Sequence, residues 1–354
     1  TSIGVYHKMG YKGAPIAHLS FGENNDCRGW LVGEENKGLS YMFQMMNEAR
    51  LHVGIGATAI ASAAYYAALE YAKARPQGRR PTDRDPLSPQ IPIIEHADVK
   101  RMLLFQRAIV EGSLALLLQC SKYADLSLVA PEAEKERAAL LLDLLTPVAK
   151  TYPAEMGILS TSQGLQCLGG YGYCEEFPLE QHFRDARIHP IHEGTTAIHG
   201  ILLLARNVPM KNGRAFTLFL EEVGRAVAAA ETDEVLKPYA RQLAEALERL
   251  QEVTNHLLGL AMQGAIELFL ADATLYIECF GIIAVAWQWL VQARVARTAL
   301  VKGPTAEEAD FYQGKLYAFR YFFSYELPKI AGPATRLLNS DGLTVEMKEH
   351  FFND

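Results

Sequence analysis

The segment from residue 42 to residue 75 reads MFQMMNEARLHVGIGATAIASAAYYAALEYAKAR, and it decides the fold class. Apolar or small residues recur every three or four positions along it, from Met42 through Val53 and Ile60 to Tyr71. This spacing is typical of a helix with one buried face, and its small side chains favour close approach of a neighbouring helix. The pattern predicts a long helix that begins at Gly38 and stops just before Pro76, because proline disfavours helical backbone.

The same period continues toward the C-terminus. It predicts helices over residues 95–125, 131–168, 215–229, 234–258, 264–300 and 306–326, and a short one from Glu193 to about Arg206. Pro147 and Pro153 are expected to kink or break the 131–168 helix, and Pro328 is expected to end the last one. The proline-rich residues 79–92 predict a loop, and the glycine-rich residues 169–173 predict a turn.

Residues 1–38 have a different character. Short apolar runs at 16–21 and 30–32 flank the turn-forming sequence GENND at 22–26, which predicts two strands and a turn. One hairpin alone is marginally stable in water, so we expect this piece to be the remnant of a larger β-domain. The expected architecture is mainly α: a β-domain remnant at 1–38, a helical bundle at 39–210 and a further helical domain at 211–354.

Composition narrows the classes of function. The chain has 354 residues, 49% hydrophobic content and a net charge of −7, which argues against non-specific binding to nucleic acid. The five cysteines are scattered without a C-x-x-C pair, so neither a zinc site nor a disulfide framework is indicated. The apolar stretches 51–69 and 279–291 are expected to be buried helices, with no integral membrane segment.

The sequence IHEGTTAIH at 191–199 carries the first chemical signal. A carboxylate at Glu193 beside the free N–H groups of an opening helix suits proton abstraction next to a carbonyl, because those groups can stabilise the oxygen that gains charge. The alternative is that Glu193 only caps a helix, since acidic residues are common in a first helical turn.

Three further motifs are ambiguous on their own. QCLGGYGY at 166–173 is either a backbone that approaches a ligand or a plain helix-ending turn. FRDAR at 183–187 suits structural salt bridges. Histidines at 182, 189, 192 and 199 lack the spacing of a metal site, and we expect no metal.

Together, and in this order, the motifs resemble one family. GEENKG at 33–38, ARPQG at 74–78, CLGGYGY at 167–173, FRDAR at 183–187 and HEGTT at 192–196 are similar to the acyl-CoA dehydrogenases. The resemblance runs from about Gly4 to Val208. The sequences ADATLY at 271–276 and RYFFSYELP at 320–328 are similar to the extra C-terminal domain of a larger subgroup, which includes bacterial fatty-acyl-CoA and methylthiopropionyl-CoA dehydrogenases.

The resemblance implies a fold and a reaction. The fold is the C-terminal four-helix bundle of that family, and the reaction is the FAD-dependent conversion of an acyl-CoA to a trans-2-enoyl-CoA, as in fatty-acid β-oxidation. Glu193 then takes the α-proton while FAD takes the β-hydride, and the Glu193 backbone N–H helps to hold the thioester oxygen. Arg50 matches a residue that orients the catalytic loop. Glu48 is one position away from the place where some relatives carry the base, so it is not a candidate.

The resemblance also implies binding residues. Arg75 and Gln77 match positions that reach the FAD of a partner subunit, and Gln166, Gly169 and Gly170 match the loop around the FAD adenine. Thr195 matches a residue near the diphosphate. His192, which replaces a frequent Tyr, and Gly194 are expected to contact the substrate. Ala197 stands where the family often has Gln.

The expected partners are an acyl-CoA, an electron-transfer flavoprotein and a second copy or three further copies of the chain. The expected location is the bacterial cytoplasm, with the mitochondrial matrix as the alternative. Because family members carry two domains before the matching region, we expect this chain to be a C-terminal half with little activity alone. Two alternatives remain open at this point: an acyl-CoA oxidase of the same fold, and a non-catalytic helical interaction module.

Overall fold

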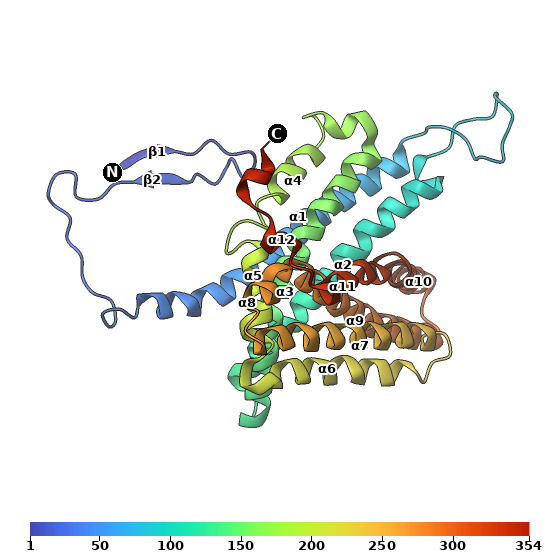
Figure 1. Cartoon of the computed structure of the whole chain (residues 1–354). Helices are drawn as coiled ribbons and strands as arrows, with labels where there is room; N and C mark the ends of the chain where they lie inside the picture. The colour runs from blue at the N-terminus through green and yellow to red at the C-terminus, as the bar shows by residue number, and fades with distance from the viewer. Residues whose placement is uncertain (354) are drawn as a thin grey trace.

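The computed structural model describes residues 1–353, without the side chains of residues 43 and 44. Helices dominate the chain, as the sequence predicted (Figure 1). The helices are α1 (Gly38–Ala74), α2 (Ala97–Val129), α3 (Glu132–Leu168), α4 (Leu179–Ala186), α5 (Thr196–Leu202), α6 (Met210–Ala230), α7 (Lys237–Met262), α8 (Ile266–Ala271), α9 (Ala273–Val301), α10 (Ala306–Tyr321), α11 (Ala331–Asn339) and α12 (Leu343–Glu346).

The N-terminal strands are not the two that the sequence predicted. Strand β1 (Ser2–Val5) pairs antiparallel with β2 (Ala17–Leu19), and Val5 lies opposite Ala17. The apolar run at 16–21 therefore pairs upstream, while residues 30–32 are exposed and lie outside both strands. The loop that joins the two strands reaches α4, where Tyr11 contacts Asp185, while the strands themselves extend away from the helices and their residues are exposed (Figure 1).

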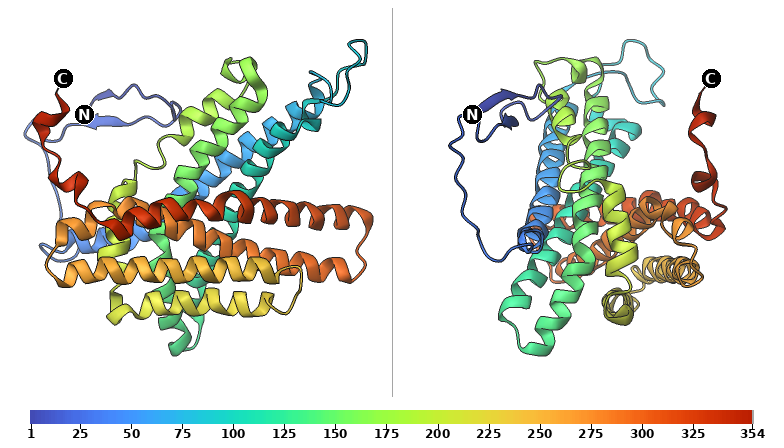
Figure 2. Two further views of the ribbon diagram at one scale, coloured as in Figure 1. Left: turned by 45° about the vertical axis from the view of Figure 1, so that its right-hand side comes forward. Right: turned by 60° about the vertical axis from the view of Figure 1, so that its left-hand side comes forward.

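Helices α1, α2 and α3 pack lengthwise into a bundle (Figure 2). The α1 face that meets α3 consists of small residues, including the buried Ala57, Ala61 and Ala64. Closest approach occurs at Gly54, where an added Cβ would collide with the carbonyl oxygen of Ala149. The small residues of the opening stretch therefore do what their spacing predicted, because they bring two long helices into near backbone contact.

A kink or a break was predicted at Pro147 and Pro153. Helix α3 is continuous through both prolines, so a break is wrong. A proline has no N–H, and it leaves the carbonyl four residues earlier without its helical partner. The side chain of Asn207 replaces that partner for Pro147, because its Nδ2 donates to the carbonyl of Asp143 at 2.6 Å. The carbonyl of Ala149, which Pro153 leaves free in the same way, lies against Gly54 of α1. Contacts with other elements thus keep the helix intact.

A second layer of helices crosses this bundle. Figure 2 shows α6, α7, α9 and α10 lying side by side, with α9 also packed against α2 and α3. Phe219, Phe280 and Trp287 form aromatic contacts between α6 and α9. The indole Nε1 of Trp289 donates to the carbonyl of Ala108 in α2 at 3.0 Å. One apolar core therefore runs through both layers.

Two helices, α2 and α9, pass a test for membrane spans by length and composition. Most of the apolar window of each is buried against other helices, 61% in α2 and 78% in α9, as in the core helices of globular proteins.

The C-terminal region differs from the prediction in two places. The predicted 264–300 helix is two helices, α8 and α9, separated at Asp272. Pro328 does not end the helical chain. After α10, residues 322–326 form a π-helix, and Pro328 lies in the first turn of a short 3-10 helix that leads into α11. Proline is tolerated in a first helical turn because an N–H there has no acceptor.

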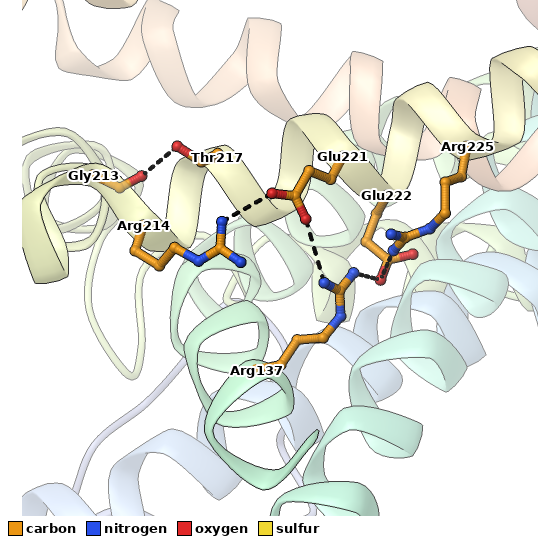
Figure 3. Close-up of polar contacts among 7 residues, drawn as sticks. All are labelled: Arg137, Gly213, Arg214, Thr217, Glu221, Glu222 and Arg225. Atoms are coloured by element: carbon orange, nitrogen blue, oxygen red, sulfur yellow. Dashed lines mark hydrogen bonds and ion pairs between the residues drawn. The ribbon is translucent and has the colours of Figure 1, made fainter. Parts of the chain in front are cut away.

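An ion network ties the bundle to the second layer (Figure 3). Arg137 of α3 reaches Glu221 of α6 at 3.5 Å and also pairs with the adjacent Glu222. Arg214 and Arg225 of α6 bind the same two carboxylates, at 2.8 and 2.6 Å. The network lies near the tip of the α2–α3 hairpin, where it fixes the start of α3 against α6.

Candidate functional site

The loop between α4 and α5 holds the candidate base. Glu193 adopts a left-handed backbone with φ of 56°, and Gly194 follows with φ of 96°. A side chain disfavours this conformation, so Glu193 stays in it only if its surroundings hold it there. An added Cβ on Gly194 would lie 2.9 Å from Nε2 of His199, so no larger residue fits at 194. The Glu193 side chain is half-buried.

Two side chains bind the carbonyls of this loop. Nε2 of His199 lies 3.0 Å from the carbonyl oxygen of Glu193, and it must carry the hydrogen because a carbonyl only accepts. Nζ of Lys150 donates to the carbonyls of His189 and Gly194, at 2.7 Å each. Both side chains are fully buried.

Burial has the expected effect on both groups. It lowers the pKa of His199 to about 4, and the charge of Lys150 acts in the same direction. Burial also lowers the pKa of Lys150 to about 8, against the opposing effect of Glu155. His199 is therefore a neutral imidazole at physiological pH, with its hydrogen on Nε2.

Arg50 of α1 is a further buried charge near the candidate base. It is 7% exposed, and its guanidinium donates to Oδ1 of Asn47 at 3.1 Å. Burial lowers its pKa, while the nearby charge of Glu193 opposes that shift. Arg50 also lines a cavity of about 300 Å³ together with Asp143, Arg206 and Asn207. The structure thus brings Arg50 and Glu193, 143 residues apart in sequence, into electrostatic contact, while Glu48 is exposed.

Residues on the N-terminal side of the base form a histidine pair. The rings of His189 and His192 lie 5.5 Å apart between centroids, and burial lowers the pKa of both. The hydroxyl of Tyr11, from the loop between β1 and β2, lies 3.1 Å from Nε2 of His189. The N–H of Tyr11 donates to Asp185 at 2.6 Å. The N-terminal segment is thereby attached to the FRDAR motif and to the loop that carries Glu193.

Thr195 and Thr196 follow the base directly. Thr195 is exposed at the start of α5, as is Ala197, whereas the hydroxyl of Thr196 donates to the carboxylate of Glu155 in α3. This bond fixes the first turn of α5 on the bundle.

The remaining predicted residues form a second group at the far end of α1 and α3. The guanidinium of Arg75 lies 5.5 Å from the ring centroid of Tyr171. Gly169 has φ of 59°, and it and Gly170 are exposed with open space around them. The side chains of Gln77 and Gln166 are exposed on the same end of the bundle.

The two groups do not meet within one chain. Arg50 lies in α1 and Arg75 directly follows its last residue, and the 25 residue steps between them correspond to about 37 Å at 1.5 Å per residue. The structure therefore brings together Arg50, His192, Glu193, Gly194 and Thr195 in one place, and Arg75, Gln77, Gln166, Gly169 and Gly170 in another.

Sequence reasoning missed four residues of the site. Lys150, Glu155 and Tyr11 lie far from the motifs in sequence, and their roles depend on which backbone groups the fold places beside them. His199 was available, since it was noted as one of four clustered histidines. The signal that could have identified it is its place in the first turn after a glycine that can adopt positive φ.

Two family models match the chain in succession. Residues 36–208 match "Acyl-CoA dehydrogenase, C-terminal domain", and residues 219–348 match "Acetyl-CoA dehydrogenase C-terminal like".

Curated relatives match almost the whole chain. A butyryl-CoA dehydrogenase of Syntrophomonas wolfei is 34% identical over 99% of the chain, and a 3-methylmercaptopropionyl-CoA dehydrogenase of Ruegeria pomeroyi is 36% identical over 96% of it. The chain spans 58% and 56% of the lengths of these two proteins.

Solved structures show the same fold. The Caenorhabditis elegans protein ACDH-11, in complex with C11-CoA, matches 92% of the chain and half of its own length, with a TM-score of 0.73 and 23% identity. An acyl-CoA dehydrogenase from Bacillus anthracis, in complex with FAD, matches 96% of the chain and 56% of its own length, with a TM-score of 0.71 and 18% identity.

Proposed function

Because this chain belongs to the acyl-CoA dehydrogenase family, we propose that it supplies the catalytic base of an FAD-dependent conversion of an acyl-CoA to a trans-2-enoyl-CoA. One observation carries the proposal. Glu193 lies in a loop whose backbone has a left-handed conformation and whose carbonyls are bound by the buried side chains of Lys150 and His199, and its charge opposes the lowering of the pKa of the buried Arg50.

In this proposal Glu193 removes the α-proton of the thioester. The carboxylate is half-buried and belongs to a loop whose carbonyls are bound to helices α3 and α5, so its position varies little during proton transfer. Arg50 orients the loop through its charge. His192 and Gly194, which flank the base, contact the thioester and set the space for the acyl group.

Each of the two groups of residues suits one end of FAD, but the two ends belong to different FAD molecules in this proposal. The cation of Arg75, the aromatic face of Tyr171 and the exposed backbone of Gly169 and Gly170 suit a diphosphate and an adenine. FAD supplies hydride acceptance at the opposite end, near Glu193. Since about 37 Å of α1 separates Arg50 from Arg75, each group serves a different FAD in a homodimer, and a tetramer would pair two such dimers.

The further partners in this proposal are an acyl-CoA and an electron-transfer flavoprotein, and the expected location is the bacterial cytoplasm. The relatives named for butyryl-CoA and 3-methylmercaptopropionyl-CoA favour a short acyl group. A panel of straight-chain acyl-CoAs from four to sixteen carbons would identify the preferred length.

The test compares the flavin-loaded protein that contains this chain with its Glu193→Gln form. Anaerobic addition of acyl-CoA is expected to bleach the flavin absorbance of the wild type, while Glu193→Gln binds acyl-CoA and reduces the flavin at least ~10³-fold more slowly, because the amide cannot accept a proton. Equal bleaching by both forms would move the base elsewhere. Rapid oxygen consumption by the reduced protein would favour an oxidase, and failure to bind flavin would favour an interaction module.

A further inference from the structure

We propose that Lys150 and His199 are positioning residues that hold the Glu193–Gly194 backbone in its left-handed conformation by binding three carbonyls of the loop, those of His189, Glu193 and Gly194. We call these two side chains the carbonyl clamp. The proposal rests on the proposed function for its effect on catalysis, while its effect on the loop can be measured independently of any reaction.

The loop needs such a clamp. Two successive residues have φ between 50° and 100°, and the first of them carries a side chain. Left-handed backbone is disfavoured for a residue with a Cβ, so an unsupported Glu193 would relax toward ordinary φ values. That relaxation would turn the carboxylate away from its present direction.

Lys150 is the more unusual half of the clamp. Its side chain is fully buried, and among the described residues no carboxylate lies within ion-pair distance of its ammonium. A buried charge without such a partner is unfavourable, so what retains it must be the groups that it binds. Those groups are the carbonyls of His189 and Gly194, one before and one after the base.

The two bonds of Lys150 bracket the base. Because the carbonyls belong to residues 189 and 194, one nitrogen fixes both ends of the segment that contains His192 and Glu193. An ammonium has three N–H groups and a neutral amine has two, so both protonation states can make both bonds. The contact therefore needs donors at this position more than it needs a charge.

His199 completes the clamp from the opposite side. Its Nε2–H binds the carbonyl of Glu193 itself, and its ring fills the space that a Cβ on Gly194 would enter. The residue lies in α5, which packs against α9, and Lys150 lies in the part of α3 that packs against α1. Two rigid elements thus determine the conformation of a loop that has no helix or strand of its own.

The decisive comparison uses two substitutions of Lys150 in the flavin-loaded protein that contains this chain. Lys150→Met and Lys150→Gln have side chains of similar length, each one atom shorter than lysine. Methionine has no N–H, whereas glutamine keeps two N–H donors without a charge. Lys73→Met is the matched control, because Lys73 is exposed and pairs only with Glu70 at 2.8 Å on the surface of α1.

The first measurement is amide hydrogen exchange in residues 190–196, which requires no turnover. We expect exchange in Lys150→Met to be ~10-fold or more faster than in the wild type, while Lys150→Gln returns most of the protection and Lys73→Met leaves it unchanged. Unchanged protection in a folded Lys150→Met protein would overturn the clamp. If Lys150→Met fails to fold, His199→Phe is compared with His199→Gln. The phenylalanine ring has no N–H donor, whereas glutamine has one.

The second measurement is the anaerobic rate of flavin reduction at saturating acyl-CoA, together with the acyl-CoA dissociation constant. We expect Lys150→Met to lower the limiting rate by ~10²-fold with less than ~3-fold change in the dissociation constant, and Lys150→Gln to regain at least ~10-fold of the rate. Equal loss in binding and rate, or no recovery with Gln, contradicts a positioning role. If no acyl-CoA reduces the flavin of the wild type, the proposed function is contradicted. The hydrogen-exchange data would still show whether the carbonyl clamp holds the loop.

Discussion

Gly194 links the backbone conformation beside Glu193 to the packing of the His199 ring. The absence of a Cβ satisfies two requirements there, a φ of 96° and the close position of the His199 ring. The sequence motif names the glycine, but only the structure shows that its neighbour in space is a histidine five residues later. The glycine of this motif is therefore needed for the packing of the loop as well as for its backbone conformation.

Gly194→Ala is expected to damage the loop without unfolding the protein. The added methyl would meet Nε2 of His199 at 2.9 Å and would disfavour the positive φ, so the free energy of unfolding should fall by about 1–3 kcal/mol. Urea unfolding followed by circular dichroism measures this change.

Gly224→Ala is the matched control, because this glycine lies inside α6 with open space around its Cβ position. Alanine is the better helix former, so this variant should gain about 0.5–1 kcal/mol. A Gly194→Ala protein as stable as Gly224→Ala would show that the loop accommodates the methyl.

His199 should make stability depend on pH in the acid range. Its pKa is about 4 in the folded chain and near 6.5 when exposed, so the unfolded chain binds the proton more tightly between these values. The free energy of unfolding therefore falls as pH drops from 6.5 toward 4, and this group contributes no change above pH 6.5.

We expect the wild type to lose about 1–2 kcal/mol more than His199→Gln between pH 7 and pH 5, because glutamine has no such proton site. Chemical unfolding at both pH values gives the difference. Parallel losses in the two proteins would mean that His199 is not protonated differently in the two states.

At the scale of an element, α3 shows why prolines mislead prediction from sequence. The periodicity placed the helix at 131–168, close to the observed bounds, but Pro147 and Pro153 suggested a break. The compensating groups come from elsewhere in the chain. Asn207 belongs to a π-helix at Leu203–Asn207 that follows α5, and Gly54 belongs to α1. A short stretch of sequence around each proline does not include these distant residues, so the compensation cannot be predicted from that stretch.

This account predicts coupling between Pro147 and Asn207. Asn207→Ala alone should cost about 1–2 kcal/mol of unfolding free energy, because the carbonyl of Asp143 is left without a partner. In a Pro147→Ala background the new backbone N–H can bind that carbonyl, so the same substitution should cost less. A double-mutant cycle in urea measures the coupling, and strictly additive effects would refute it.

The same distinction holds for the other elements: those that depend on local sequence were predicted, and those that depend on distant residues were not. The helical period correctly predicted long helices in the two layers, because the apolar residues of each helix recur every three or four positions in the sequence. The strands were only partly predicted, because the run at 16–21 pairs with residues 2–5 and not with 30–32. Helix α4 was not predicted, since its eight residues are too few to show a period.

At the scale of the whole molecule, the two layers share one apolar core. Residues of α2, α3, α6, α7, α9, α10 and α11 belong to a single cluster of buried side chains. The family models divide the chain near residue 210, but the packing does not, because α9 lies against the bundle and against α7 at once. The placement of Glu193 thus depends on both layers.

We expect the helical layers to unfold in a single transition. Trp287 and Trp289 are buried in α9, and Trp289 binds α2 of the other layer, whereas Trp30 is already exposed in the folded chain. The change in tryptophan fluorescence on unfolding therefore reports on the surroundings of α9, while far-ultraviolet circular dichroism reports on all helices. The two signals should have the same urea midpoint. Separate midpoints would indicate two independently stable layers.

Trp289→Phe should lower the free energy of unfolding by about 1–2 kcal/mol, because the hydrogen bond from the indole to the carbonyl of Ala108 is lost and the smaller ring leaves a cavity. Trp30→Phe is the control, since Trp30 is 83% exposed and should change stability by less than about 0.5 kcal/mol.

Helix α1 carries Arg50 about a third of the way along its length, and Arg75 directly follows its last residue, so the number of residues between them sets the spacing of the two groups. Deleting one residue between them would shorten the separation by about 1.5 Å and rotate one group by about 100° around the helix axis relative to the other. Insertions and deletions within residues 51–74 should therefore be eliminated during evolution, even where every individual side chain tolerates substitution. We therefore expect the number of residues in this part of the helix to stay constant among related proteins.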